Sequence, residues 1–306
     1  MIMKRLLFVY NAKSGKAKIR TRLADIIDVF IKEGYRVEAY QTQCPMDASN
    51  KIARDGREFD LIVCSGGDGT LNEVASGVMR LEHKPVIGYI PSGSTNDFGK
   101  SIGLYKDMVR SAEVAVKGTP ISVDIGQLNQ DRNFVYIAAF GIFTDVSYQT
   151  SQNMKNVLGH QAYIIEGIKS LTNVKSYKMK IEYEDGVIED EFIYGMISNS
   201  ESAGGFKGIT GKDVILDDGL YEGTFVKVPK SPIELSSIIN SLLGGNNKSE
   251  NIYNFKTSKV KVTCDEPVSW VLDGEFGGEH KEVDIINHAN AVQIMAHLHK
   301  KNKKNV

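Results

Sequence analysis

Cysteine is scarce in this sequence, and no apolar run is long. Three cysteines, Cys44, Cys64 and Cys264, are spread over 306 residues without a CxxC pair. This pattern argues against a disulfide framework or a zinc site and favours reduced thiols in a cytosolic compartment. The longest nearly apolar run, residues 135–143, falls well short of the ~20 residues that a membrane-spanning helix needs. We therefore expect a cytoplasmic protein that does not span a membrane.

An excess of charge of one sign is also missing. The sequence has 37 Lys and Arg against 38 Asp and Glu, a formal net charge of −1. It therefore lacks the basic character expected of a nucleic-acid-binding protein. The apolar stretch 6–10 is too short for the hydrophobic region of a signal peptide, and we interpret it as a first buried strand. With 42% hydrophobic and 25% charged residues, the composition predicts one large globular domain or two ordinary ones.

Several common catalytic motifs are absent. The sequence contains no GxxxxGK[ST], no GxSxG and no HExxH, and its six histidines show no paired ligand spacing. These absences argue against a Walker-type nucleotide site, a serine hydrolase and a zinc protease. Cys64 falls in a predicted buried strand, where a packed thiol is the ordinary interpretation.

The first ~120 residues alternate between strand and helix periodicity. Strands are predicted at 6–10, 35–42, 61–65 and 85–91, and helices at 16–33, 47–56, 71–78 and 105–117. Gly34 stands where a helix C-cap glycine is expected. This alternation predicts an α/β domain with a mostly parallel sheet covered on both faces.

From about residue 120 the pattern changes to short alternating strands. They are predicted at 121–128, 134–141, 178–197 (a hairpin around Asp185-Gly186), 220–228, 259–264, 268–275 and 291–298. Two helices are expected near 160–172 and 232–243. We therefore predict a mostly antiparallel second domain, a β-sandwich, with a boundary near 120–125.

Three glycines surround one aspartate directly after the strand at 61–65. Gly66, Gly67, Asp68 and Gly69 lie where this strand ends and a helix begins. Glycines let a ligand approach the backbone, and a helix N-terminus attracts phosphate. Asn72 stands where the dinucleotide fingerprint has its last glycine. A tight turn with close packing of the chain is the alternative interpretation of this loop.

Two other loops follow predicted strands at the same edge of the sheet. The first, 11–18, carries Asn11, Ser14 and Gly15, and the second, 91–99, carries Ser94 and Asn96. Each alone is an ordinary turn between a strand and a helix. Because the carboxyl ends of parallel strands meet at one edge, three such loops together favour a ligand site.

Together these motifs resemble a known family. N-x-x-S-G (11–15), G-G-D-G-T-L-N-E (66–73) and P-x-G-S-T-N-D-F (91–98) resemble the bacterial diacylglycerol kinase-type lipid kinases, a family that includes the catalytic domains of eukaryotic diacylglycerol and sphingosine kinases. The resemblance covers nearly the whole chain. Ala12 replaces a usual proline and Ser94 a usual threonine, and neither change removes a group needed for nucleotide binding.

The resemblance implies both the fold and the domain limits. A Rossmann-like α/β domain, similar to those of NAD kinase and phosphofructokinase, is expected at 1–122 and completed by the last strand within about 288–306. A β-sandwich domain with the acceptor site and catalytic carboxylates is expected at 123–287.

It also implies the residues of a nucleotide site. By position, ATP is expected to be bound by Asn11, Ser14, Gly15, Thr42, Gly66, Gly67, Asp68, Gly69, Thr70, Leu71, Asn72, Ser94 and Asn96. Thr42 stands outside a tight motif. An acidic residue beside a phosphate makes sense if Mg²⁺ lies between them, which is the expected role of Asp68; a helix N-cap is its alternative role.

Two acidic segments of the second half match the family as well. In 214–223, Mg²⁺ is expected on Asp218 with the carbonyls of Ile215 and Leu220, an oxygen-only set that suits a hard cation. In 269–279, Asp273 or Glu275 is expected to accept the proton of the substrate hydroxyl or to hold a metal–water network. Outside the family, both segments are more often turns.

The sequence therefore predicts an ATP- and Mg²⁺-dependent kinase for a lipid alcohol such as diacylglycerol. Peripheral, transient contact with the inner face of the membrane and a homodimer are implied too. An NAD kinase-like enzyme and a non-catalytic nucleotide- or lipid-binding protein are the alternatives. The acceptor lipid, the donor nucleotide and the choice between Asp273 and Glu275 as base stay open.

Overall fold

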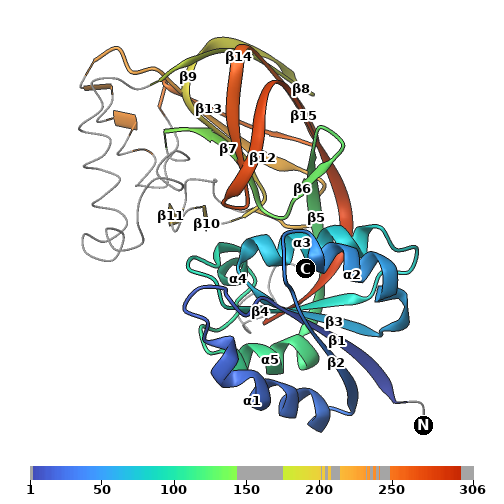
Figure 1. Cartoon of the computed structure of the whole chain (residues 1–306). Coiled ribbons are helices and arrows are strands. Elements are labelled where there is room, and N and C mark those ends of the chain that lie inside the picture. Colours follow the sequence, from blue (N-terminus) through green and yellow to red (C-terminus); the bar gives the residue numbers. More distant parts are fainter. Residues whose placement is uncertain are drawn as a thin grey trace. The chain divides into compact units, whose positions relative to one another are not determined.

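The computed structural model describes residues 3–142, 175–200, 214–231 and 249–297, with the short pieces 202–203, 206–207, 233–234, 237–238 and 241. The chain divides into two compact units, one of residues 1–125 and 289–306 and one of residues 126–288 (Figure 1). The expected limits were 122/123 and 287/288. The predicted helix near 160–172 lies outside the described residues, as does most of the one near 232–243.

Strands and helices alternate along the first unit. In chain order they are β1 (Lys4–Tyr10), α1 (Ile19–Lys32), β2 (Tyr35–Gln41), α2 (Asp47–Asp55), the 3₁₀ helix η1 (Gly56–Glu58), β3 (Leu61–Gly66), α3 (Asp68–Met79), β4 (Val86–Pro91), α4 (Asp97–Ser101) and α5 (Met108–Lys117). The sheet order is β2-β1-β3-β4-β15, where β15 (Glu275–Ala296) comes from the end of the chain. These neighbours pair in parallel. The predicted α/β unit is confirmed; its likeness to a Rossmann fold stays a prediction.

Helices cover both faces of this sheet. In Figure 1, α1 and α5 lie on one face and α2 and α3 on the other. Alternate residues of a strand point to opposite faces, so Leu6 and Phe8 of β1 pack with Ile26 and Phe30 of α1 in one buried cluster. After α1 the chain turns at Gly34, whose φ of 84° favours glycine. The helix therefore ends where the sequence predicted.

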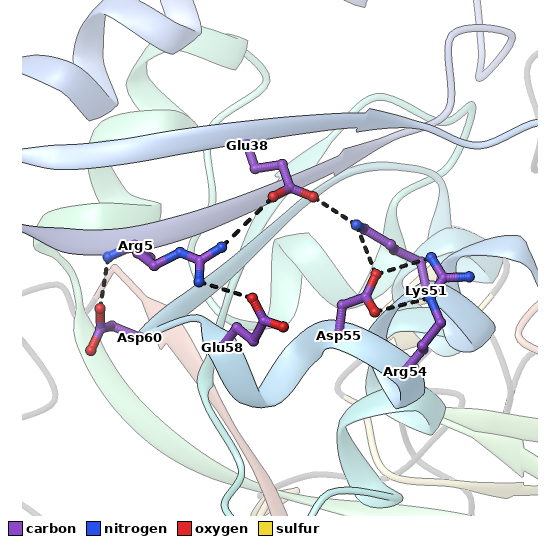
Figure 2. Close-up of polar contacts among 7 residues, drawn as sticks. All are labelled: Arg5, Glu38, Lys51, Arg54, Asp55, Glu58 and Asp60. Carbon is purple, nitrogen blue, oxygen red and sulfur yellow. Dashed lines mark hydrogen bonds and ion pairs between the residues drawn. The ribbon is translucent and has the colours of Figure 1, made fainter.

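Ion pairs surround one edge of this sheet. Figure 2 shows seven residues of this network, drawn from β1, β2, α2, η1 and the loop before β3: Arg5, Glu38, Lys51, Arg54, Asp55, Glu58 and Asp60. Lys51 Nζ lies 2.6 Å from Glu38 Oε1 and 2.9 Å from Asp55 Oδ2, and its side chain is only 10% exposed. These contacts join α2 to the edge strand β2.

Most described residues of the second unit lie in strands. They are β6 (Arg132–Phe134), β7 (Ile137–Gly141), β8 (Tyr177–Tyr183), β9 (Gly186–Ser198), β10 (Ser202–Ala203), β11 (Phe206–Lys207), β12 (Tyr221–Lys227), β13 (Ile252–Thr257) and β14 (Lys259–Leu272), with parts of β5 (Thr119–Leu128) and β15. The order β13-β12-β9-β7-β14-β15 is antiparallel throughout, and β8 bridges β9 and β14. The prediction of an antiparallel, strand-rich second unit is confirmed, and its finer description as a sandwich stays a prediction.

Two sequence-based predictions in this unit were wrong in detail. The strands predicted at 259–264 and 268–275 are mainly one strand, β14, whose register with β15 shifts between Thr263 and Val268. The first hairpin pairs Tyr183 with Gly186, so its two-residue turn lies one residue earlier than predicted. Short-range patterns do not show that a strand continues through such a shift.

Aromatic side chains fill the core of the second unit. Phe140 lies 5.1 Å from Trp270 and 6.0 Å from Phe225, measured between ring centroids. Phe225 in turn lies 5.7 Å from Phe192. Aromatic rings bury large areas and so stabilise the strands that carry them. No helix among the described residues is long and apolar enough to cross a bilayer.

Candidate functional site

Three loops of the first unit meet at the carboxyl ends of β1, β3 and β4. The Asn11 amide donates to Ser65 O at 2.9 Å, and the Ser92 amide donates to Gly66 O at 2.8 Å. Thr42, after β2, donates its amide to Tyr10 O at 3.0 Å. The predicted loops 11–18, 66–72 and 91–99, with Thr42, therefore form one polar edge.

Glycines let these loops approach one another. At Gly93, a Cβ atom would lie 2.6 Å from Gly67 Cα, and at Gly15 it would collide with Ser92 O. Gly15 also has a φ of 54°, where other residues are strained. Close packing therefore explains Gly15 and Gly93, and it assembles the edge at which a ligand would bind. At Gly67, in the glycine-rich loop itself, a Cβ atom would make only ordinary contacts, at 3.5 Å or more, so close packing does not explain this glycine.

The N-terminus of α3 opens onto this edge. Gly67 is its N-cap, and Thr70 N and Leu71 N both donate to Gly67 O. The amides of Asp68 and Gly69 therefore precede the first hydrogen bonds within the helix, where anions are favoured. Asp68 is the first residue of the helix, so its alternative role as N-cap is wrong. Leu71 is fully buried, which leaves only its backbone for a ligand.

A second acidic residue, Asp97, contacts Asp68 through its backbone amide. The Asp97 amide donates to Asp68 Oδ2 at 3.3 Å, and both residues are buried. The carboxylate of Asp97 lies 3.0 Å from Lys100 Nζ. Asp97 was not predicted as a candidate, although it directly follows Asn96 in the third motif. Two adjacent acidic residues at a helix N-terminus fit a site that also holds a cation.

The remaining predicted residues support the loops. Asn96, in a left-handed conformation, accepts from Gly93 N at 2.8 Å and donates to Gly93 O at 2.9 Å. Asn11 Oδ1 accepts from Lys13 N at 2.9 Å. Asn72 accepts from the Ser76 hydroxyl. The two predicted hydroxyl residues differ in exposure: Ser94 is exposed, whereas Thr42 is half-buried. All the predicted nucleotide-binding residues thus belong to the first unit.

The predicted catalytic turn lies in the second unit. Leu272 pairs with Glu275, so Asp273 and Gly274 form a two-residue hairpin turn with φ values of 51° and 87°. The Asp273 carboxylate accepts the amides of Val135, Tyr136 and Ile137 at 2.7, 3.0 and 3.2 Å. Asp273 is buried, whereas Glu275 is exposed. The two acidic residues of this turn therefore have different surroundings.

The predicted metal loop is joined to this turn by hydrogen bonds. Tyr136 O accepts from Asn199 N at 2.8 Å, and Asn199 Nδ2 donates to Leu216 O at 3.1 Å. Asp218 Oδ1 accepts from Leu220 N at 3.0 Å. Among the described residues, no three His, Cys, Asp or Glu side chains could hold a metal together. A cation here would therefore depend on backbone carbonyls as well as on carboxylate, which fits the predicted donors.

Two further charged residues adjoin this loop. Glu222 Oε1 lies 3.0 Å from Lys256 Nζ. Burial raises the pKa of the Glu222 carboxyl above its ordinary value, and Lys256 opposes this effect. Burial tends to lower the pKa of Lys256, but its hydrogen bond to Glu222 and the charges of Glu222 and Asp218 outweigh it and raise the pKa. Neither residue was among the candidates predicted from the sequence.

Known proteins resemble this chain in sequence and fold. A sequence profile described as the diacylglycerol kinase catalytic domain matches residues 5–128. The diacylglycerol kinase of Bacillus subtilis is 32% identical over 278 residues, which cover 90% of this chain and 91% of the relative. That of Staphylococcus saprophyticus is 34% identical over 279 residues, which cover 90% of each chain.

Solved structures agree at the level of the fold. A crystal structure of a diacylglycerol kinase from Bacillus anthracis has a TM-score of 0.74 and 21% identity, covering 97% of this chain and 98% of that one. Another crystal structure from the same organism has a TM-score of 0.83 and 24% identity, covering 97% and 96%. Identity above 30% over nine-tenths of two relatives carries the assignment. The chain belongs to the bacterial diacylglycerol kinase family of lipid kinases.

Proposed function

We propose that this protein is an ATP- and Mg²⁺-dependent kinase that transfers the γ-phosphoryl group to the hydroxyl of a lipid alcohol such as diacylglycerol. The observation that carries this proposal is the meeting of three polar loops at the N-terminus of α3, in a chain of this family. Such an edge combines amide donors, hydroxyls and two carboxylates, which phosphoryl transfer requires.

The nucleotide phosphates would be held by the backbone from Gly67 to Gly69, with hydroxyl and amide groups of the neighbouring loops. Asp68 and Asp97 would hold the cation that accompanies the phosphates. When bound, Mg²⁺ supplies positive charge that offsets the charge developing on the transferred group. Loop-to-loop hydrogen bonds keep these donors in place before a ligand arrives, which reduces the entropy cost of binding.

Glu275 is our choice for the residue that accepts the proton of the lipid hydroxyl. Its exposure supports this role, because a general base must reach the substrate. Asp273 instead holds residues 135–137 through its three hydrogen bonds and so positions the turn. A second cation, on Asp218 and the carbonyls of Ile215 and Leu220, would stabilise the loop that Asn199 joins to this turn.

Two associations complete the proposal. The lipid substrate implies peripheral, transient contact with the inner face of the cytoplasmic membrane. The family resemblance suggests a homodimer formed through the second unit. Flotation with lipid vesicles and sedimentation velocity would test these two associations separately.

The activity is tested by phosphate transfer from γ-labelled ATP to a panel of micelle-dispersed lipid alcohols with Mg²⁺. We expect transfer to one lipid class, and loss of transfer in Asp68→Asn. Asp25→Asn is the control, because Asp25 forms an exposed ion pair with Arg22 on α1. Parallel reactions contain NAD instead of lipid, or another nucleoside triphosphate instead of ATP.

The outcomes separate the alternatives. Transfer to NAD and to no lipid would mean an NAD kinase-like enzyme. ATP binding without transfer to either acceptor would mean a non-catalytic nucleotide-binding protein. Retention of full activity in Asp68→Asn would remove the proposed role of the α3 N-terminus.

A further inference from the structure

Two carboxylates of the second unit share one ammonium group. Lys256 Nζ lies 3.0 Å from Glu222 Oε1 and 3.8 Å from Asp218 Oδ2. Glu222 on β12 is directly opposite Lys256 on β13, so the strand register itself brings them together. The loop with Asp218 immediately precedes β12. A single positive charge is therefore placed between two negative ones.

Buried oxygen atoms beside this pair lack hydrogen bonds. Glu222 Oε2 and Ser198 Oγ have no partner among the residues that the structure describes, and the Glu222 side chain is only 10% exposed. Ser198 on β9 is directly opposite Glu222. Opposite residues of antiparallel strands point to the same face. Unpaired buried oxygens are costly, so this group of atoms has unused capacity for a positively charged ligand.

We propose that Glu222 supplies a second carboxylate to the divalent cation bound by the Asp218 loop, and that Lys256 competes with this cation. The inference deepens the proposed function and rests on its Mg²⁺-binding part. Carboxylate, carbonyl and hydroxyl oxygens are the ligands that Mg²⁺ prefers. An ammonium group is a compact positive charge on a flexible stem, so it can leave the carboxylates when a cation binds. Lys256 thereby sets how much Mg²⁺ the loop requires.

A purely structural ion pair makes a different prediction. If Lys256 only neutralised Glu222, its loss would lower stability at every Mg²⁺ concentration and leave the Mg²⁺ affinity unchanged. If it competes with the cation, its loss leaves two carboxylates without a positive charge. The Mg²⁺ affinity then rises, and Mg²⁺ restores the stability that the substitution removed.

The test is calorimetric titration of Mg²⁺ alone into the full chain, without nucleotide or lipid. We expect Lys256→Met to raise the Mg²⁺ affinity about tenfold and Glu222→Gln to lower it about tenfold. Asp218→Asn should abolish the binding, which locates it at this loop. Lys261→Met is the matched control: Lys261 pairs with Glu282 and is 41% exposed, against 43% for Lys256. The Mg²⁺ affinity of Lys261→Met should stay within about twofold of the wild type, because the charge of Lys261 is paired with Glu282 and not with the Asp218 loop.

Thermal unfolding with and without Mg²⁺ gives a second readout. Lys256→Met should gain more thermal stability from Mg²⁺ than the wild type does. If Lys256→Met does not fold, Glu222→Gln still decides, because it keeps the volume of the side chain and removes its charge. Unchanged Mg²⁺ affinity in Lys256→Met or in Glu222→Gln would overturn the inference. Absence of measurable Mg²⁺ binding in the wild type and in Lys256→Met would also overturn it.

This result is independent of the kinase assay. If substitution of Lys256 and Glu222 left the Mg²⁺ affinity unchanged, the proposed transfer of phosphate from ATP to lipid could still be correct. Failure to phosphorylate any lipid would leave the effect of Lys256 on Mg²⁺ binding in place.

Discussion

Asp273 has both carboxylate oxygens engaged by backbone amides, and it adopts a φ of 51° at the first position of a hairpin turn. A carboxylate whose lone pairs are already occupied by fixed donors is poorly placed to take a proton from a substrate. Glu275, two residues further on, has the reach that Asp273 lacks. At the scale of single residues, this difference supports our proposal that Asp273 positions the turn and Glu275 is the reacting residue.

The first prediction concerns Glu275. Glu275→Gln should reduce kcat by a factor of about 10²–10⁴, the usual contribution of a general base. Its KM values and thermal midpoint should change little, because the side chain is exposed. Steady-state kinetics of lipid phosphorylation test this. Glu279→Gln, an exposed acidic residue on the same strand, is the control. An equal loss in both variants would contradict the assignment.

The second prediction concerns Asp273. Asp273→Asn should lower the free energy of unfolding by about 2–4 kcal/mol, because an amide group replaces one acceptor of a buried network. Asparagine tolerates positive φ, so the effect reflects the lost charge and hydrogen bonding of the carboxylate and not strain in the backbone. Chemical denaturation measures it. A stability equal to the wild type, with activity lost, would instead identify Asp273 as a reacting group.

At the scale of helices, Glu73, the last residue of the motif at 66–73, contacts a neighbouring helix. It lies on α3, and its two carboxylate oxygens accept Met46 N at 2.8 Å and Ala48 N at 3.2 Å, at the start of α2. The first amides of a helix have no partner within the helix. Glu73 therefore caps α2 from a neighbouring helix, and this contact gives Glu73 a structural role.

Loss of this cap should be measurable. Glu73→Ala should lower the free energy of unfolding by about 1–2 kcal/mol, because the amides of α2 lose a charged acceptor. Glu113→Ala, an exposed acidic residue on α5, should change it by less than about 0.5 kcal/mol. Urea unfolding followed by circular dichroism tests both. Equal stabilities for the two variants would show that Glu73 does not cap α2.

The ion pairs of Figure 2 predict a pH dependence. Hydrogen bonds from Arg54 and Lys51 lower the pKa of Asp55 from 3.8 to about 2. Because the pKa is lower in the folded state, Asp55 stabilises the protein above about pH 3.8, and this contribution is lost as the pH falls towards 2. Asp55→Asn should therefore lower stability by about 0.5–1 kcal/mol at neutral pH.

Measurements at acidic pH test this prediction. The difference between wild type and Asp55→Asn should shrink as thermal unfolding is measured at successively lower pH. Asp28→Asn, which removes an exposed ion pair with Lys32, provides the comparison. A difference that stays constant down to pH 2 would mean that the carboxylate charge of Asp55 does not matter.

At the scale of the whole molecule, we expect the nucleotide to bind to the first of the two units. A non-hydrolysable ATP analogue should slow amide hydrogen exchange in 11–15, 66–72 and 91–97, the loops of the first unit. Residues 252–264 of the second unit should exchange as before, because local protection follows the bound ligand. Mass spectrometry of proteolytic fragments resolves these segments. Protection that begins in 252–264 would place the nucleotide elsewhere.

Much of this architecture could be read from local signals. The alternation of buried strands with amphipathic helices located the elements of the first unit, and Gly34 located the end of α1. The three loops were found because each motif follows a strand. Asp97 was missed, because nothing in a single sequence distinguishes its role from that of an ordinary helix-start aspartate.

Contacts between distant segments could not be read in this way. Lys256 lies far along the chain from Asp218, and only the pairing of β12 with β13 brings them together. Asn199 connects Tyr136 with Leu216 through hydrogen bonds that leave no periodic pattern. A single sequence contains no signal for strand partners this far apart, since many pairings satisfy the same alternation of side chains.

The long strand β15 has a consequence for how the protein is made. It begins in the second unit, and its last residues pair with β4 in the first, where Lys84 Nζ also donates to Ala291 O at 2.9 Å. The ribosome therefore synthesises four strands of that parallel sheet well before the fifth. A nascent chain must keep an open sheet edge beside β4 until β15 has been synthesised. We expect this interval to be the period in which the unfinished protein most needs a chaperone.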